Sequence, residues 1–159
     1  MNVSRSAFAA LAGSFITLGI VQRKSVAAAS GTQLNAVMYG SKLGIKGPDG
    51  LPHDIMIPSN FVLKVGKPVT LTVENYDEGP HSITVPDLNL NLVLKAGKEQ
   101  ADKSVIPVTT TFNFTPSKKG VFRWFCALPC DEKHGAWDMK AGYGGPGQEG
   151  FMAGYFVVR

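Results

Sequence analysis

Hydrophobic and polar residues alternate along several short stretches of the chain, with the period of two that is typical of half-buried β-strands. In the clearest stretch, 69–74, Val69, Leu71 and Val73 alternate with two threonines and a glutamate. Other β-rich stretches cover 32–39, 61–65, 82–85, 104–114, 121–125 and 153–158. After residue 30 no stretch shows the helical period. The pattern predicts six to eight short strands and less than about 15% helix.

Glycine and proline separate these stretches, for instance in Gly-Pro-Asp-Gly at 47–50 and Pro-Ser-Lys-Lys-Gly at 116–120. Short strands joined by such turns are typical of an antiparallel Greek-key sandwich or barrel, so we expect an all-β fold of this kind. We expect 41–58 to be a loop, 87–103 to be irregular, and Pro107 to mark an edge or a bend. Within 131–139 we expect at most one helical turn.

The first 29 residues differ from the rest. Arg5 precedes an apolar stretch of 15 residues at 7–21, which is too short to cross a bilayer comfortably. Three alanines at 27–29 then resemble a cleavage site, whereas Arg23 and Lys24 are unusual for a cleaved signal. We therefore predict that 1–29 is a signal peptide or an N-terminal membrane anchor. The domain, 30–159, then lies in the periplasm or another extracytoplasmic space.

Composition and charge exclude several classes of protein. A chain of 159 residues that is 44% hydrophobic and 18% charged has the size of one globular domain and is neither disordered nor a coiled coil. Its formal charge of +4 includes three basic residues within the first 29, so the remainder is nearly neutral. Because that remainder has no lysine or arginine cluster, we expect no nucleic-acid partner. We also expect the domain to be a monomer.

The residues that carry chemistry are few. Cys126 and Cys130 are only four apart, and a disulfide that closes so short a loop adds little stability. The two cysteines are therefore more readily explained by a chemical role than by a structural disulfide. Imidazoles at His81 and His134 and a thioether at Met139 or Met152 complete a mixed sulfur and nitrogen set, which copper prefers in electron-transfer sites.

These segments resemble the cupredoxins, a family of small copper electron-transfer proteins. The run 120–126 (Gly-Val-Phe-Arg-Trp-Phe-Cys) looks like the family's strand that leads into the ligand cysteine. The run 75–82 is similar to the loop that delivers the first ligand histidine, and 152–158 to the axial methionine entering the last strand. The resemblance covers about 61–159 and implies a Greek-key copper domain. It implies the ligands His81, Cys126, His134 and, as the axial thioether, Met152 or Met139.

The resemblance also implies that the backbone N–H of Ser82 bonds to the sulfur of Cys126, which would raise the reduction potential. In addition, the Cys-x3-Cys-x3-His spacing at 126, 130 and 134 resembles the dinuclear copper loop of cytochrome c oxidase subunit II. Those relatives place a methionine three residues after the histidine, where this chain has Trp137. One copper ion is therefore favoured, while a dinuclear centre with Cys130 as a ligand stays open.

No catalytic or phosphate-binding motif accompanies these residues, so we expect an electron carrier and not an enzyme. The expected role is Cu(II)/Cu(I) cycling with a redox protein such as a c-type cytochrome or a membrane oxidase. Copper binding and delivery without electron transfer is the alternative. Of the other candidate ligands, we expect His53 to lie at the surface and Met38 and Met56 to be packing residues.

Overall fold

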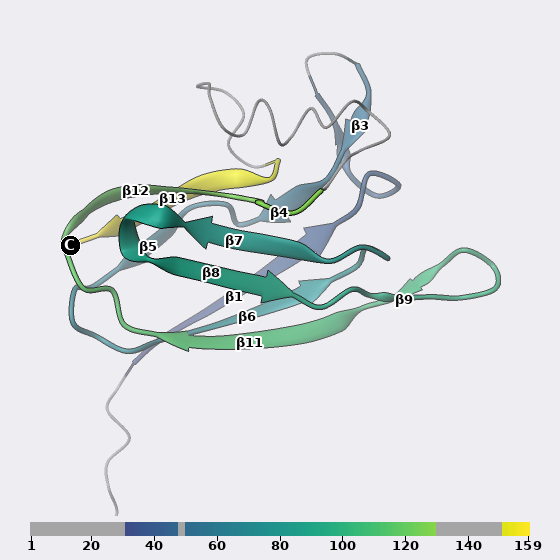
Figure 1. The fold of residues 1–159 in the computed structure, drawn as a ribbon. Helices are drawn as coiled ribbons and strands as arrows, with labels where there is room; N and C mark the ends of the chain where they lie inside the picture. The colour runs from purple at the N-terminus through teal and green to yellow at the C-terminus, as the bar shows by residue number, and fades with distance from the viewer. Residues whose placement is uncertain (1–30, 48–49, 130–150) are drawn as a thin grey trace, which may run out of the picture.

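The computed structural model describes residues 31–47, 50–129 and 151–159. Within these ranges the chain forms thirteen β-strands and one short 3-10 helix, arranged as two facing sheets and two small hairpins (Figure 1). The predicted all-β Greek-key sandwich is confirmed. In the view of Figure 1, β7 and β8 of one sheet lie above β1, β6 and β11 of the other.

The first sheet has four strands in the order β11-β6-β1-β4. Strand β1 runs parallel to β6 and antiparallel to β4, and β11 runs antiparallel to β6. Every second residue of β6 is buried, so the alternation in the sequence faces the core. The bounds are β1 Thr32–Tyr39, β4 Ile55–Ile57, β6 Val69–Asn75 and β11 Val108–Phe114.

The second sheet has five strands in the order β5-β13-β12-β7-β8. Strand β13 runs parallel to β5, and the other neighbours are antiparallel. The central strand β12 therefore lies between the last strand of the chain and β7. The bounds are β5 Phe61–Leu63, β7 His81–Val85, β8 Leu90–Leu94, β12 Gly120–Phe125 and β13 Ala153–Val158.

Short elements complete the described chain. One hairpin pairs β2 with β3, and the other pairs β9 with β10. The 3-10 helix η1 connects β7 to β8. The bounds are β2 Ile45–Lys46, β3 Pro52–His53, η1 Pro86–Leu88, β9 Lys98–Glu99 and β10 Val105–Ile106.

Trp124 is the largest fully buried side chain of the core between the sheets. Its indole Nε1–H donates to the carbonyl of Ser59 at 2.6 Å. Trp124 pairs across the sheet with Gly154, where a Cβ would overlap the same carbonyl. A glycine is therefore needed at this position for β13 to pass close to Ser59.

Two regions differ from the sequence prediction. The expected loop 41–58 contains β2, β3 and β4, and the irregular stretch 87–103 contains β8 and β9. Most of these strands have only two or three residues, too few to show a period of two. As Pro107 suggested, the long run 104–114 is interrupted there and forms β10 and β11.

The predicted signal or anchor at 1–29 and the possible helical turn at 131–139 lie outside the described residues. In the described part of the chain, no helix is long and apolar enough to cross a membrane.

Candidate metal centre

Three of the candidate ligands lie at one end of the five-stranded sheet. His81 is the first residue of β7, Cys126 directly follows β12, and Met152 directly precedes β13. Because β12 runs antiparallel to both neighbours, its last residue, Phe125, pairs with Ala153 at the beginning of β13 and with Thr84 of β7, and the chain that follows continues toward the beginning of β7. A hydrogen bond of 3.0 Å from the N–H of Cys126 to the carbonyl of Met152 ties two of these positions together.

All three side chains face the interior. His81, Cys126 and Met152 are each only 1% exposed. Cys126 continues the inward-facing set of β12, and Met152 has the inward phase of β13. Cys126 and Met152 also belong to the same buried hydrophobic cluster. The end of the sheet thus gathers an imidazole, a thiol and a thioether in a site shielded from water.

The sulfur of Cys126 is held by neighbouring backbone groups. The N–H of Ser82 donates to it at 3.4 Å, which is the bond that the sequence resemblance implied. The thiol in turn donates to the carbonyl of Leu128 at 3.6 Å. The hydroxyl of Ser82 accepts a hydrogen bond of 2.8 Å from the N–H of Ala127, so Ser82 holds both the sulfur and the residue after it.

The two ring nitrogens of His81 differ in their surroundings. Nε2 lies 2.9 Å from a carboxylate oxygen of Asp77. Nδ1 is buried and has no hydrogen-bond partner among the described residues. A buried polar atom without a partner is unfavourable, so such an atom calls for a further ligand. With a cysteine sulfur and a methionine nearby, the donor set fits a soft transition metal such as copper.

Electrostatics favour charge on this ring in the metal-free protein. Burial lowers the pKa of His81, but the hydrogen bond to Asp77, the nearby Cys126 sulfur and the charge of Asp54 together raise it to about 9. Burial alone would raise the pKa of Asp77. The hydrogen bonds from His81 and Gly79 have the larger effect, so the pKa of Asp77 lies below its usual range. Asp77 and His81 therefore form a partly buried ion pair in the metal-free protein.

The loop between β6 and β7 is rigidly built. Asn75, which is fully buried, donates from its amide to the carbonyls of Gly79 and Lys95, at 2.9 and 3.0 Å. Its amide oxygen accepts from the N–H of Asp77 at 2.9 Å. The loop that delivers His81 is thus fixed from within by a side chain of β6.

The sequence analysis missed two carboxylates beside this site. One potential ligand atom from each of Asp54, Asp77 and His81 lies within 4.8 Å of the others. An aspartate in a turn-rich segment is typical of a solvated loop, and both aspartates lie in such segments. Only the short distance of four residues between Asp77 and His81 hinted at their contact.

The prediction for His53 is wrong, because this residue is fully buried. Its ring packs edge-on against Phe151, with centroids 5.8 Å apart. The N–H of Met56 also bonds to the carbonyl of Phe151, so this segment lies against the start of the last strand. Met38 and Met56 are fully buried in the core, as predicted.

Cys130, His134 and Met139 lie outside the described residues, so their part in the site stays a prediction. The described residues place the other three candidates, His81, Cys126 and Met152, at one end of the sheet.

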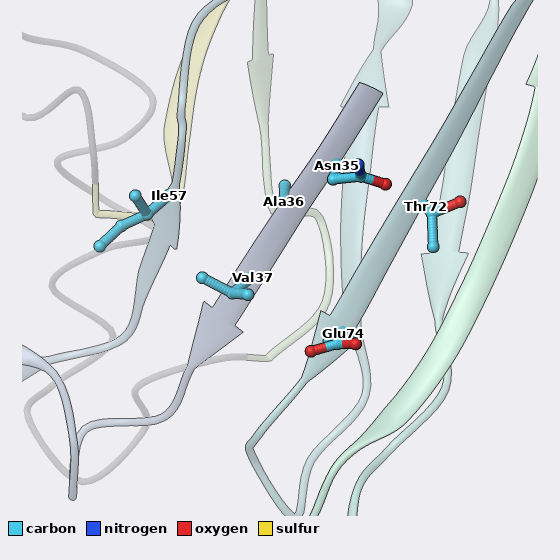
Figure 2. Close-up of a pocket in the computed structure, with 6 residues that line it drawn as sticks. All are labelled: Asn35, Ala36, Val37, Ile57, Thr72 and Glu74. Carbon is cyan, nitrogen blue, oxygen red and sulfur yellow. The ribbon is translucent and has the colours of Figure 1, made fainter. Parts of the chain in front are cut away.

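A separate hollow of about 260 Å³ lies on the four-stranded sheet. Figure 2 shows its lining side chains on β1, β4 and β6, among them Val37, Ile57 and Glu74. Its described lining residues include no sulfur or imidazole, and the hydroxyl of Tyr76 already donates to Glu74 at 3.1 Å. This hollow therefore has none of the chemistry gathered around Cys126.

No protein-family model matches the chain, and no curated protein matches it. Several solved structures are similar to it. Auracyanin from Roseiflexus castenholzii is 14% identical, with a TM-score of 0.48, over 80% of this chain and 97% of that one. A purple cupredoxin from Nitrosopumilus maritimus is 17% identical, with a TM-score of 0.38, over 79% and 99% of the two chains. The periplasmic domain of cytochrome oxidase subunit II from Bradyrhizobium japonicum is 16% identical, with a TM-score of 0.43, over 83% and 88%.

Proposed function

We propose that this chain is an extracytoplasmic copper protein of the cupredoxin type, which passes single electrons between redox partners. One observation carries the proposal. The buried Nδ1 of His81 lacks a partner among the described residues, at the end of the sheet where Cys126 and Met152 are also buried. A free imidazole nitrogen, a thiol and a thioether in one dry site form the donor set of copper electron-transfer centres.

His81, Cys126 and Met152 are the proposed ligands from the described chain, and His134 is the proposed second imidazole. Met139 is the alternative axial thioether, and Cys130 is a further candidate that would permit a dinuclear centre. One copper ion is favoured. When bound, copper would supply a one-electron Cu(II)/Cu(I) couple.

The protein's own residues would keep the ligand set nearly fixed through that cycle. The backbone bond between Cys126 and Met152 and the side-chain bonds of Asn75 brace the ligand positions. The N–H of Ser82 withdraws negative charge from the Cys126 sulfur and so favours Cu(I). Small rearrangement between the two oxidation states is what rapid electron transfer requires.

Burial favours electron transfer over copper delivery. A delivery protein hands its ion to a partner by ligand exchange, which needs ligands that the partner can reach. His81, Cys126 and Met152 are almost completely shielded from solvent. Electrons cross a few ångströms of protein, whereas a copper ion needs an open path.

The proposed location and partner follow from the sequence. An export signal or anchor at 1–29 would place the domain in the periplasm or an equivalent space. A c-type cytochrome or a membrane oxidase would then be the redox partner of a monomeric carrier.

Reconstitution of the purified chain with Cu(II) tests the proposal. We expect an intense visible charge-transfer band and a reversible one-electron couple. A colourless chain that retains only Cu(I) would support copper delivery instead. A chain that binds no copper would contradict both functions.

A further inference from the structure

We propose that Asp77 is a positioning residue for His81, and that its carboxylate shifts the copper site toward Cu(II). This inference rests on the proposed function, because it concerns a ligand of the same site. It assigns a role to a residue that does not itself touch the metal.

The first step is the choice of ring nitrogen. An ionised carboxylate only accepts hydrogen bonds, so at the 2.9 Å contact Nε2 of His81 carries the proton and Asp77 accepts it. In the neutral ring the lone pair then lies on Nδ1, which is the buried nitrogen without a partner among the described residues. Asp77 thus selects Nδ1 as the metal-binding atom.

The second step is the fixed position of the carboxylate. The oxygen that accepts from His81 also accepts from the N–H of Gly79 at 3.0 Å. The backbone of Asp77 donates to the amide oxygen of Asn75 at 2.9 Å and accepts from the N–H of Gly97 at 2.7 Å. The side chain and the backbone of Asp77 are therefore both held.

Two glycines leave the space for this carboxylate. A Cβ on Gly40, directly after β1, would overlap Oδ1 of Asp77. A Cβ on Gly79 would lie 2.9 Å from Oδ2. A side chain at either position would push the carboxylate away from His81. The backbone at Gly40 and Gly79 lies so close to the carboxylate of Asp77 that only glycine fits at these two positions without displacing it.

The third step is the effect on the metal. A carboxylate bonded to Nε2–H makes the imidazole a stronger electron donor, and its negative charge stabilises the more highly charged ion. Asp54 adds a second carboxylate close to the same ring. Asp77 therefore favours Cu(II), opposite in direction to the N–H of Ser82.

The variant Asp77→Asn tests this role, because it keeps the size of the side chain and removes its charge. Asp102→Asn is the matched control. Asp102 also accepts hydrogen bonds within its own turn, from Ser104, but it is exposed at the hairpin of β9 and β10. Affinities of the full chain for Cu(II) and for Cu(I) are measured by competition with chelators. We expect Asp77→Asn to weaken Cu(II) binding about 10- to 100-fold and Cu(I) binding less, with the control unchanged.

Comparing the affinities for Cu(II) and Cu(I) distinguishes an effect on the preference between the two ions from a general disruption of the loop. Equal losses for Cu(II) and Cu(I), or no loss for either, would overturn the role of Asp77 while leaving copper binding itself intact. A wild-type chain that binds neither ion would overturn the proposed function and this role with it.

A second variant keeps the test valid if Asp77→Asn does not fold. Gly79→Ala retains the charge but must displace the carboxylate. We expect it to reduce the preference for Cu(II) over Cu(I) in the same direction and by a smaller factor. An unchanged preference would overturn the proposal.

Discussion

The backbone N–H of Ser82 points at the sulfur of Cys126, with a nitrogen–sulfur distance of 3.4 Å. The two residues are far apart in the sequence and meet because β7 lies beside β12 in the sheet. Each is only 1% exposed, so water does not compete for this bond. The thiol of Cys126 therefore has a fixed donor on one side before any metal binds.

The side chain of Ser82, whose hydroxyl also lies 4.0 Å from the sulfur of Cys126, has a further role that can be tested. Its hydroxyl accepts from the N–H of Ala127 at 2.8 Å, and Ser82→Ala removes this acceptor without changing the backbone N–H. We expect the free energy of unfolding to fall by about 1 kcal/mol in denaturant titrations. The visible copper band should persist, and Ser104→Ala, at an exposed serine, provides the control. Loss of the band in Ser82→Ala would show that copper binding at the Cys126 sulfur depends on the hydroxyl of Ser82 and not on its N–H alone.

The two cysteines should respond differently to substitution. Cys126 ends the inward-facing set of β12, where Ser82 holds its sulfur, whereas Cys130 is the extra residue of the loop pattern. We expect Cys126→Ser to abolish the visible band in absorption spectra and Cys130→Ser to leave a coloured site. If both variants lose the band, the site is a dithiolate one.

The axial ligand is tested by the reduction potential. Met152 is buried, and its carbonyl accepts from the N–H of Cys126, so the scaffold holds it still. A thioether favours Cu(I) more than an amide oxygen does, so Met152→Gln should lower the potential with copper retained. Met139→Gln should change it much less. Met56→Leu, a change at a buried methionine of the core, serves as the control in the same voltammetry. If Met139→Gln changed the potential more than Met152→Gln did, the axial ligand would instead be Met139.

The core around Trp124 predicts a stability effect that is independent of copper. Trp124→Phe removes the indole donor from the carbonyl of Ser59 and leaves a small cavity. We expect a loss of about 2 kcal/mol in the free energy of unfolding of the metal-free chain. Val121→Ala, at an exposed position of the same strand, should change it by less than about 0.5 kcal/mol. If Trp124→Phe and Val121→Ala lowered the free energy of unfolding equally, the hydrogen bond and packing of Trp124 would not contribute to stability.

The sequence predicted the strands with a strong period of two and missed those without one. The first strand, 32–39, and the last, 153–158, have the predicted bounds. Strand β8 was missed although Leu90, Leu92 and Leu94 alternate along it. Asn89 and Asn91 flank Leu90, and because asparagine is depleted in strands they mask the signal.

The site was predictable only as far as its chemistry is local. Thiol, imidazole and thioether groups are recognisable by residue type, so His81, Cys126 and Met152 could be chosen as candidate ligands from the sequence. The role of Asp77 depends on Gly40, which approaches it from the end of β1 and is distant in the sequence. The burial of His53 likewise depends on its packing against Phe151 near the other end of the chain. Contacts of this kind arise from the tertiary fold and leave no spacing pattern.

The central claim is that Cys126 and His81 hold a copper ion. The most direct measurement is the metal-to-protein ratio of the chain reconstituted with Cu(II), combined with its EPR spectrum. The account predicts one tightly bound copper ion per chain, with the hyperfine splitting of a single copper nucleus narrowed by a thiolate ligand. A signal split by two equivalent copper nuclei would contradict the single-ion site, and the absence of stoichiometric copper would contradict the claim itself.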